Sequence, residues 1–255
     1  MSAYEQFFQL HYNHAPLLIG NVWDVVSARA FERSGYKAIA TSSAAIAHTW
    51  GYEDGEKIPF DLLLKVVERV MSNVNIPLSV DMEGGYSRDI SKIIQNIEKL
   101  YELGVVGINI EDSVKGEKLY MQSVDDFQKV ISSISSHLER KNIKMFLNAR
   151  TDAFLHKLPS PITETVKRIK AYENAGANGI FVPFISDKDE IREAVEATKL
   201  PLNVFSMPTL PDFKELSALG VRRISMGRAV RIVLTRSLEK IIQTIMEDQS
   251  FKSLY

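Results

Sequence analysis

The sequence contains no cysteine, almost no net charge and no long hydrophobic run, and each absence excludes a class of function. Without cysteine the chain can form no disulfide, no thiolate metal site and no cysteine nucleophile or acid. Its 31 Lys and Arg residues balance 32 Asp and Glu residues, which leaves a formal charge of −1. No overall field therefore attracts nucleic acid or an anionic membrane.

No targeting or membrane-spanning segment is expected. No apolar run approaches the roughly 20 residues that a spanning helix needs. The first 16 residues lack the basic segment followed by an apolar one that marks a signal peptide. Since the lack of cysteine also suits a reducing compartment, these features predict a cytoplasmic protein with no membrane and no nucleic acid among its partners.

Short apolar runs alternate with amphipathic stretches along all 255 residues. Strands are predicted at 16–21, 37–42, 77–81, 106–111, 144–149, 178–183, 201–205 and 222–226. Apolar residues have helical spacing at 60–74 and 90–104, and glycine repeatedly closes a helix before the next strand, as in "AGANGIFV". This alternation predicts an α/β protein folded as a (β/α)8 TIM-type barrel. A doubly wound sheet is disfavoured because "GNVWD" lacks the G-x-G-x-x-G fingerprint.

Acidic side chains follow two of these strands, at the end where a barrel carries its active site. Asp81 and Glu83 end the third strand, and Glu111 and Asp112 end the fourth. Because Asp81 and Glu83 are two residues apart, they would point to the same side of an extended segment. Adding Glu111 or Asp112 would put three carboxylates at one mouth, where they repel one another unless they are protonated or bridged by a cation. Oxygen ligands without a histidine pattern suit Mg²⁺ or Mn²⁺.

The neighbouring strand ends carry neutral and basic side chains. "TSSA" (41–44) ends the second strand, and Asn148 and Arg150 end the fifth. Arg150 could neutralise the acids in a structural ion pair, or its planar fork could bind an anionic group of a ligand. His48 follows the second strand, where a packed or solvated role is favoured, and no H-x-H or H-E-x-x-H pattern indicates a zinc hydrolase. No lysine ends strands four to six, which disfavours a Schiff-base aldolase.

Four stretches together resemble the isocitrate lyase / phosphoenolpyruvate mutase superfamily: "TSSAAIAHTWGYEDG" (41–55), "SVDMEGGYS" (79–87), "INIEDS" (108–113) and "LNARTDAF" (147–154). The resemblance covers nearly the whole chain, with the motifs in matching order. It implies a barrel that binds a 2-oxo acid on Mg²⁺, and a last helix that is exchanged between subunits of a homodimer or homotetramer. We therefore expect one domain over 1–255, with an N-terminal arm at 1–15 and a C-terminal helical segment at 228–255.

The resemblance also implies roles for individual positions. Asp81 resembles the direct metal ligand, and Glu83 and Glu111 resemble carboxylates that hold metal-bound waters. Asp54 resembles a catalytic loop acid at the metal and substrate, and Arg150 resembles the catalytic arginine that grips the substrate. The remaining substrate-binding positions are predicted to be Ser42, Ser43, Ala44 and Asn148.

The chain departs from the family's patterns at points that bear on the reaction. Glu83 replaces the second Asp of the usual Asp-x-Asp motif, which a water-mediated contact tolerates. The Lys-Lys-Cys-Gly of the C–C lyases is absent, which disfavours isocitrate or methylisocitrate cleavage by the usual mechanism; the Lys-x-Asn-Ser of the phosphonomutases is absent too. Another proton donor is therefore needed. Lys115, Lys118 and Tyr120 are candidates, on a loop at 113–122 that could close over the site.

These features favour a Mg²⁺-dependent enzyme of small 2-oxo acids that cleaves a C–C or C–P bond through a metal-stabilised enolate. Oxaloacetate-like decarboxylation, a carbon–carbon lyase reaction, is the leading hypothesis. A phosphonopyruvate hydrolase or mutase is the first alternative. A non-catalytic protein that binds 2-oxo acids is the second, and tight Mg²⁺-dependent binding without turnover would distinguish it.

Overall fold

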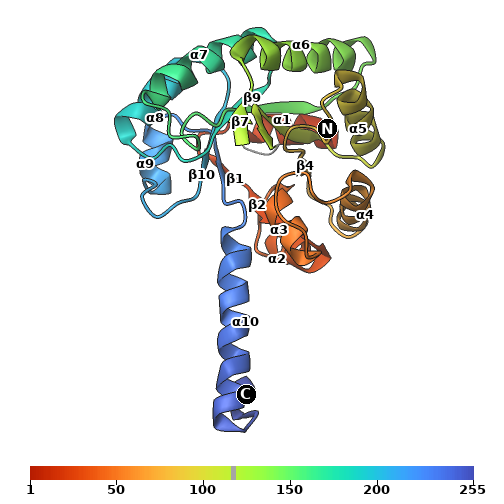
Figure 1. Cartoon of the computed structure of the whole chain (residues 1–255), viewed down its shortest axis with the longest axis vertical. Helices are drawn as coiled ribbons and strands as arrows, with labels where there is room; N and C mark the ends of the chain where they lie inside the picture. The colour runs from red at the N-terminus through yellow and green to blue at the C-terminus, as the bar shows by residue number, and fades with distance from the viewer. Residues whose placement is uncertain (116–118) are drawn as a thin grey trace.

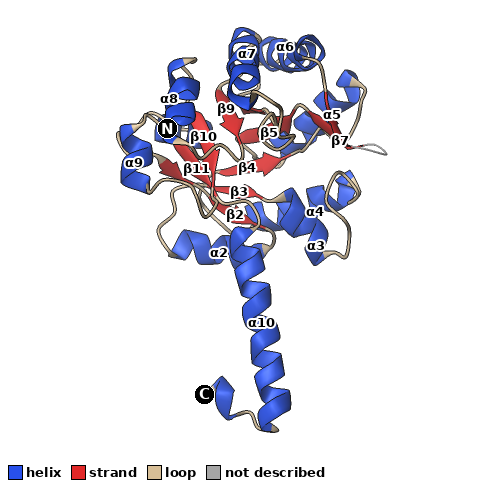
Figure 2. Ribbon diagram, turned by 60° about the vertical axis from the view of Figure 1, so that its left-hand side comes forward, coloured by secondary structure: helices blue, strands red, loops and turns tan. Residues whose placement is uncertain are grey.

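The computed structural model describes residues 1–115 and 119–255 and contains a parallel β-barrel surrounded by helices (Figure 1; Figure 2). The order around the sheet is β1-β11-β10-β9-β8-β5-β4-β3-β2. Its strands are β1 (Leu17–Leu18), β2 (Gly20–Val22), β3 (Ile39–Thr41), β4 (Leu78–Asp81), β5 (Gly107–Glu111), β8 (Phe146–Arg150), β9 (Gly179–Val182), β10 (Leu202–Phe205) and β11 (Arg223–Ser225). The predicted (β/α)8 class is confirmed.

The barrel closes through its first strand, which is interrupted at Ile19. β1 pairs with β11 at one end of the sheet order, and β2 pairs with β3 at the other. The backbone N–H of Ile19 donates to the carbonyl of Ile224 at 2.9 Å, which continues the contact with β11. The single strand predicted at 16–21 is thus two strands that each serve a different neighbour.

Helices cover the outside of the barrel and bury one apolar face each. In α4 (Phe60–Met71) the buried residues Leu63, Val66, Val67 and Val70 have helical spacing, and α5 (Ile90–Glu102) repeats this pattern. Both helices lie within the predicted ranges, 60–74 and 90–104. The others are α2 (Val25–Arg33), α3 (Ser43–Thr49), α6 (Val124–Arg140), α7 (Pro161–Asn174), α8 (Lys188–Glu196) and α9 (Phe213–Ala218).

The predicted N-terminal arm contains a helix, α1 (Ala3–Leu10), that packs against the barrel. Its Phe7 is fully buried in a cluster with Leu17, Val106 and Phe146, which lie at or just before the starts of strands. His11, directly after the helix, stacks on the Phe146 ring with 4.2 Å between centroids. This end of the barrel is therefore filled, which leaves the opposite end for a ligand.

The last helix, α10 (Ala229–Asp248), projects away from the barrel, and a short 3-10 helix, η1 (Lys252–Leu254), follows it (Figure 2). No residue of α10 is buried. The segment "SMGRAV" (225–230) runs from the end of β11 into the start of this helix. None of the helices in the described ranges combines the length and apolar composition that crossing a bilayer requires.

A small antiparallel hairpin follows β5 and lies outside the barrel sheet. It consists of β6 (Ser113–Lys115) and β7 (Leu119–Met121), with Val114 opposite Tyr120. The segment 113–122, predicted to be a closing loop, thus contains a strand near each of its ends. Of the three proposed proton donors, Tyr120 is exposed, whereas Lys118 and the side chain of Lys115 lie outside the described residues.

Candidate active site at the barrel rim

A cavity of about 310 Å³ opens at the carboxyl ends of the strands. This volume lies within the range of small-molecule sites. Its lining combines an acidic group, small polar residues, two arginines and an apolar group. The residues are Asn21, Ser42, Ser43, Ala44, Asp54, Asp81, Glu83, Asn109, Glu111, Ser113, Leu119, Arg150, Leu155, Phe181, Pro183, Phe184, Phe205, Ser225, Gly227 and Arg228.

Asp81 is the last residue of β4 and is fixed by contacts with the β3 segment. Its carboxylate accepts a hydrogen bond from the Ser43 hydroxyl at 2.9 Å, and its backbone N–H donates to the Thr41 hydroxyl at 2.8 Å. Burial raises the pKa of Asp81, although the positive charge of Arg150 works in the opposite direction. A cation beside this carboxylate would therefore favour its charged form.

Glu83 reaches the cavity by a turn rather than by strand alternation. β4 ends at Asp81, and Glu83 has φ +50°, so the expectation that the two lie in one extended segment was wrong. The Glu83 carboxylate accepts from the backbone N–H of Glu56 at 3.0 Å, and its carbonyl accepts from the N–H of Glu111 at 2.9 Å. A left-handed glutamate is uncommon, and such strain often accompanies a functional site.

Asp54, the predicted loop acid, lies at the cavity on an exposed loop. Glu56, two residues later, ties this loop to the turn after β4. Its carboxylate accepts from the Tyr86 N–H at 2.7 Å and forms an ion pair with Arg88. The loop and the turn therefore support each other at the rim.

Arg150, at the end of β8, pairs with two acids. It contacts Glu111 at 2.7 Å through Nη1, and Asp152 through Nε at 2.7 Å and Nη2 at 3.2 Å. Burial opposes the charge on Arg150, but Asp152 and Glu111 raise its pKa above the ordinary value. Burial also raises the pKa of Glu111. The ion-pair interpretation of Arg150 is thus supported. Among the described residues, three of its five N–H groups have partners and two do not.

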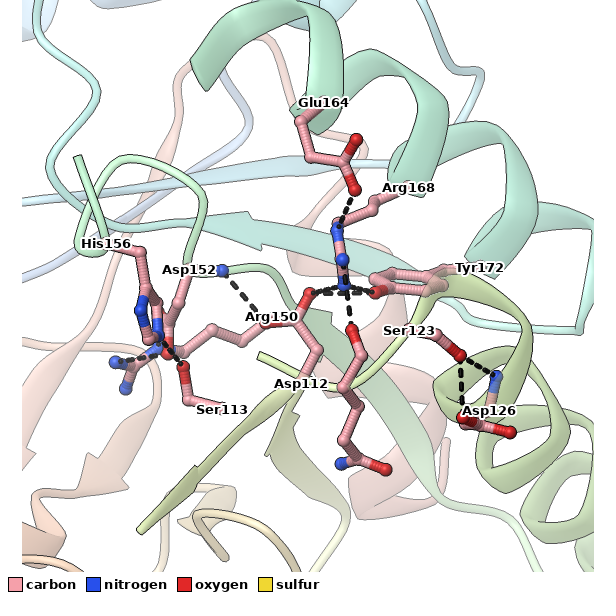
Figure 3. A network of polar contacts seen from close by, with 11 residues as sticks. Asp112, Ser113, Ser123, Asp126, Arg150, Asp152, His156, Glu164, Arg168 and Tyr172 are labelled. Carbon is pink, nitrogen blue, oxygen red and sulfur yellow. Dashed lines mark hydrogen bonds and ion pairs between the residues drawn. The ribbon is translucent and has the colours of Figure 1, made fainter. Parts of the chain in front are cut away.

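Asp112 points away from the cavity, and its suggested place among the mouth acids was wrong. The residue is fully buried and contacts Arg168 at 2.8 Å, the Tyr172 hydroxyl at 2.7 Å and the Asp152 N–H at 3.0 Å (Figure 3). Arg168 also donates to the carbonyl of Gln122 at 3.0 Å. This network joins β5, α7 and the end of the hairpin, so Asp112 supports the rim without lining it.

Asn148, a predicted substrate-binding residue, lies inside the barrel below the cavity lining. It is almost fully buried, and its amide donates to the side-chain oxygens of Asn109 at 2.8 Å and Asn203 at 3.3 Å. These contacts give it a structural role, and the predicted contact with substrate gains no support from the geometry. The predicted residues Ser42, Ser43 and Ala44 do line the cavity, and the Ser42 hydroxyl also caps α3.

A model of the phosphoenolpyruvate phosphomutase family matches residues 7–246. The chain belongs to this family. The resemblance to the isocitrate lyase / phosphoenolpyruvate mutase superfamily is thereby confirmed.

Several known proteins are similar over most of the chain. An uncharacterized protein of Mycobacterium tuberculosis is 32% identical over 87% of this chain and 81% of its own. Oxaloacetate decarboxylase 1 of Pseudomonas fluorescens is 29% identical over 79% and 70%. A Burkholderia cenocepacia structure, described as a candidate phosphonomutase, is 33% identical with a TM-score of 0.89 and covers 94% and 99%. A phosphonopyruvate hydrolase solved with oxalate and Mg²⁺ shares the fold, at 21% identity, a TM-score of 0.86 and coverage of 99% and 90%.

The donor chemistry at the mouth fits the hard divalent cation that the family implies. Asp81, Glu83 and Glu111 offer only oxygen atoms, and Asp81 and Glu111 have raised pKa values because they are buried. Within the described ranges, however, no three Asp, Glu or His side chains are arranged to hold one ion between them. The assignment of Asp81 as the direct ligand, with Glu83 and Glu111 holding metal-bound waters, therefore stays a prediction.

A serine and a histidine beside the cavity were not identified from the sequence. The hydroxyl of Ser113, a lining residue, is 3.0 Å from Nε2 of His156 (Figure 3). His156 is half-buried. The two residues are 43 positions apart, and no local pattern connects them.

Proposed function

We propose that this protein is a Mg²⁺-dependent enzyme that breaks the C–C bond β to the keto group of a small 2-oxo acid, in an oxaloacetate-like decarboxylation. The observation that supports this most is the position of Asp81. It lies at the carboxyl end of a barrel strand, bonded to Ser43, in a cavity that also holds Glu83, Glu111 and Arg150. The similarity to oxaloacetate decarboxylase 1 favours decarboxylation within the family.

Mg²⁺ bound at Asp81 would attract the negative charge that develops on the keto oxygen of the substrate. The chain's own groups would bind and orient that substrate. Ser42, Ser43 and Ala44 are proposed to receive its carboxylate end, and the free N–H groups of Arg150 would hold an anionic group. Asp54, on the exposed loop at the rim, is proposed to act as the loop acid at the metal and substrate.

The carbon that loses its substituent must gain a proton, and the Ser113 hydroxyl is our proposed source. Ser113 faces the cavity, and His156 at 3.0 Å can return a proton to it from the half-buried side. The pair replaces the missing cysteine without requiring residues 116–118. Tyr120, the described member of the original candidates, is exposed on β7.

Cleavage of a C–P bond is the second candidate. The matching family model is named for a phosphomutase, and the 33% identical Burkholderia cenocepacia structure carries a related description. Phosphonopyruvate would occupy the same acidic mouth. Release of inorganic phosphate would identify a hydrolase, and formation of phosphoenolpyruvate would identify a mutase.

The function is tested by turnover of a panel of 2-oxo acids, including oxaloacetate and phosphonopyruvate, with and without Mg²⁺. We expect metal-dependent pyruvate formation from oxaloacetate above the spontaneous rate. Asp81→Asn should lower it by about 100-fold or more, because a neutral amide holds the cation weakly. Since burial already disfavours a charge on Asp81, the variant should remain folded.

The matched control is Asp61→Asn, which changes an exposed carboxylate outside the cavity. It should retain wild-type turnover. Full metal-dependent activity in Asp81→Asn would contradict the proposal. Tight Mg²⁺-dependent binding with no turnover of any compound in the panel would favour the non-catalytic alternative.

A further inference from the structure

The cavity has an apolar wall opposite its acids. The wall consists of Phe181, Pro183, Phe184 and Phe205, from the ends of β9 and β10. Going around the closed barrel from β10, the strand β4 is the fourth one reached, after β9, β8 and β5. It is also the fourth in the other direction, after β11, the β2/β1 strand and β3. The wall therefore lies across the barrel from Asp81, and its side chains contain no hydrogen-bonding group.

Phe184 holds an unusual conformation to present its ring there. Its φ is +66°, in the left-handed region that bulky residues rarely adopt, and 41% of its surface is exposed. Its ring contacts that of Phe205, with 5.5 Å between centroids, so the two rings form one surface.

The chain after β11 passes close to the Phe205 ring, and a glycine leaves room for that ring. Gly227 lines the cavity with φ +49°, and a Cβ at this position would lie 2.4 Å from Cε2 of Phe205. Any larger residue would push the Phe205 ring from its place. Two independent backbone features, at residues 184 and 227, therefore maintain the apolar wall.

Two arginines, Arg150 and Arg228, supply the positive charges of the cavity lining. Arg150 has its guanidinium 5.6 Å from the centre of the Phe181 ring and is paired with Glu111 and Asp152. Arg228 is the second arginine of the lining and is exposed at the start of α10. The wall itself offers no hydrogen bond, so it suits an apolar group of the ligand.

We propose that the 2-oxo acid bound at this site carries an apolar or aromatic group in addition to the carboxylate that leaves in the proposed decarboxylation. This inference rests on the proposed function, since the acidic side of the cavity must hold the 2-oxo acid end. The apolar group packs against Phe184 and Phe205, and Phe181 lies beneath it. A substrate such as an aryl- or branched-alkyl-substituted 2-oxo acid matches both sides of the cavity.

Binding of stable 2-oxo acids in the presence of Mg²⁺ tests this, by calorimetry on the full chain. The probes are pyruvate, which lacks a substituent, phenylpyruvate, which carries an aromatic one, and 2-oxoglutarate, which carries a second carboxylate. We expect phenylpyruvate to bind about ten-fold or more tightly than either, because only its ring can be buried on the wall.

Phe184→Asn removes the ring at the position where it is most exposed. Asparagine adopts the left-handed conformation more readily than phenylalanine, so the variant should fold. It should lose most of the preference for phenylpyruvate and keep wild-type affinity for oxalate with Mg²⁺. Phe213→Asn, which removes another exposed phenylalanine away from the cavity, should change neither.

Each outcome separates this inference from the proposed function. Oxalate binding with Mg²⁺ but equal affinity for pyruvate and phenylpyruvate would overturn the inference and leave the function standing. Tighter binding of 2-oxoglutarate would also overturn it and indicate Arg228 as an anchor. No binding of oxalate with Mg²⁺ would instead refute the function on which the inference rests.

Discussion

Glu111 and Asp112 are neighbours in the chain, yet each has a different arginine as its partner. Glu111 faces the cavity and contacts Arg150, whereas Asp112 faces α7 and contacts Arg168. Alternation along a strand end sends adjacent side chains to opposite sides. Glu111 is thus available to the site. Asp112 holds the scaffold beneath it (Figure 3).

The proposed proton relay through His156 can be tested separately from ligand binding. His156→Gln keeps a hydrogen-bonding group near Ser113 but cannot relay a proton, so kcat should fall by about 100-fold. The affinity for oxalate with Mg²⁺, measured by calorimetry, should stay at the wild-type value. Equal loss of both quantities would assign His156 to a structural role.

His11 makes the stability of the fold depend on pH. Burial and the nearby charge of Arg223 lower its pKa from 6.5 to about 3. Between these values the unfolded chain binds a proton that the folded chain excludes. Acidification through this range therefore lowers the free energy of unfolding, by up to about 1.4 kcal/mol per pH unit.

Urea unfolding of the wild type and His11→Gln at pH 7 and pH 4.5 measures this effect. Groups other than His11 titrate in both proteins, so the difference between them isolates the histidine. The wild type should lose about 2 kcal/mol more than the variant on acidification. An identical loss in both would show that His11 remains accessible to protons.

The last helix, α10, carries an apolar stripe that nothing in the described part of its own chain buries. Val230, Leu234, Leu238, Ile242 and Met246 recur every fourth residue, and all are exposed. A helix with such a stripe buries it against a partner. This supports the proposal that α10 packs against, or is exchanged with, a second copy of the chain.

Light scattering tests this proposal through the mass of the particle in solution. The wild type should be a dimer or tetramer of the 28.8 kDa chain. Leu238→Glu with Ile242→Glu should lower the mass toward that of one chain, because burying two charges opposes association. Lys240→Glu, on the opposite side of the helix, should leave the mass unchanged. A monomeric wild type would contradict the proposal.

At the scale of the whole molecule, the sequence predicts the alternation of elements well and their closure poorly. The apolar runs identify the barrel strands, since a parallel sheet is buried on both faces. The break at Ile19 has no local signal, because it depends on which strand each half meets. The packing of α1 into the barrel end also requires residues far along the chain, such as Phe146.

The site, too, has a part that the sequence predicts and a part that depends on the fold. Asp81, Glu83, Glu111 and Arg150 can be predicted because they follow strands, and the strand ends of a barrel share one rim. The convergence of Glu83 by a left-handed turn could not be predicted from its spacing. The Asp112 network, the Ser113–His156 pair and the apolar wall join residues from separate elements, so only the fold reveals them.

The most direct test of the central claim is the thermal stability of the protein with oxalate and Mg²⁺, separately and together. Oxalate resembles the planar, charged end of a reacting 2-oxo acid. At 100 times its Kd, a ligand of the folded state adds about 2.7 kcal/mol, which raises the Tm by a few degrees. We predict a shift that needs both components and disappears in Asp81→Asn. No shift in any combination would mean that the acids of this rim do not form a working metal site.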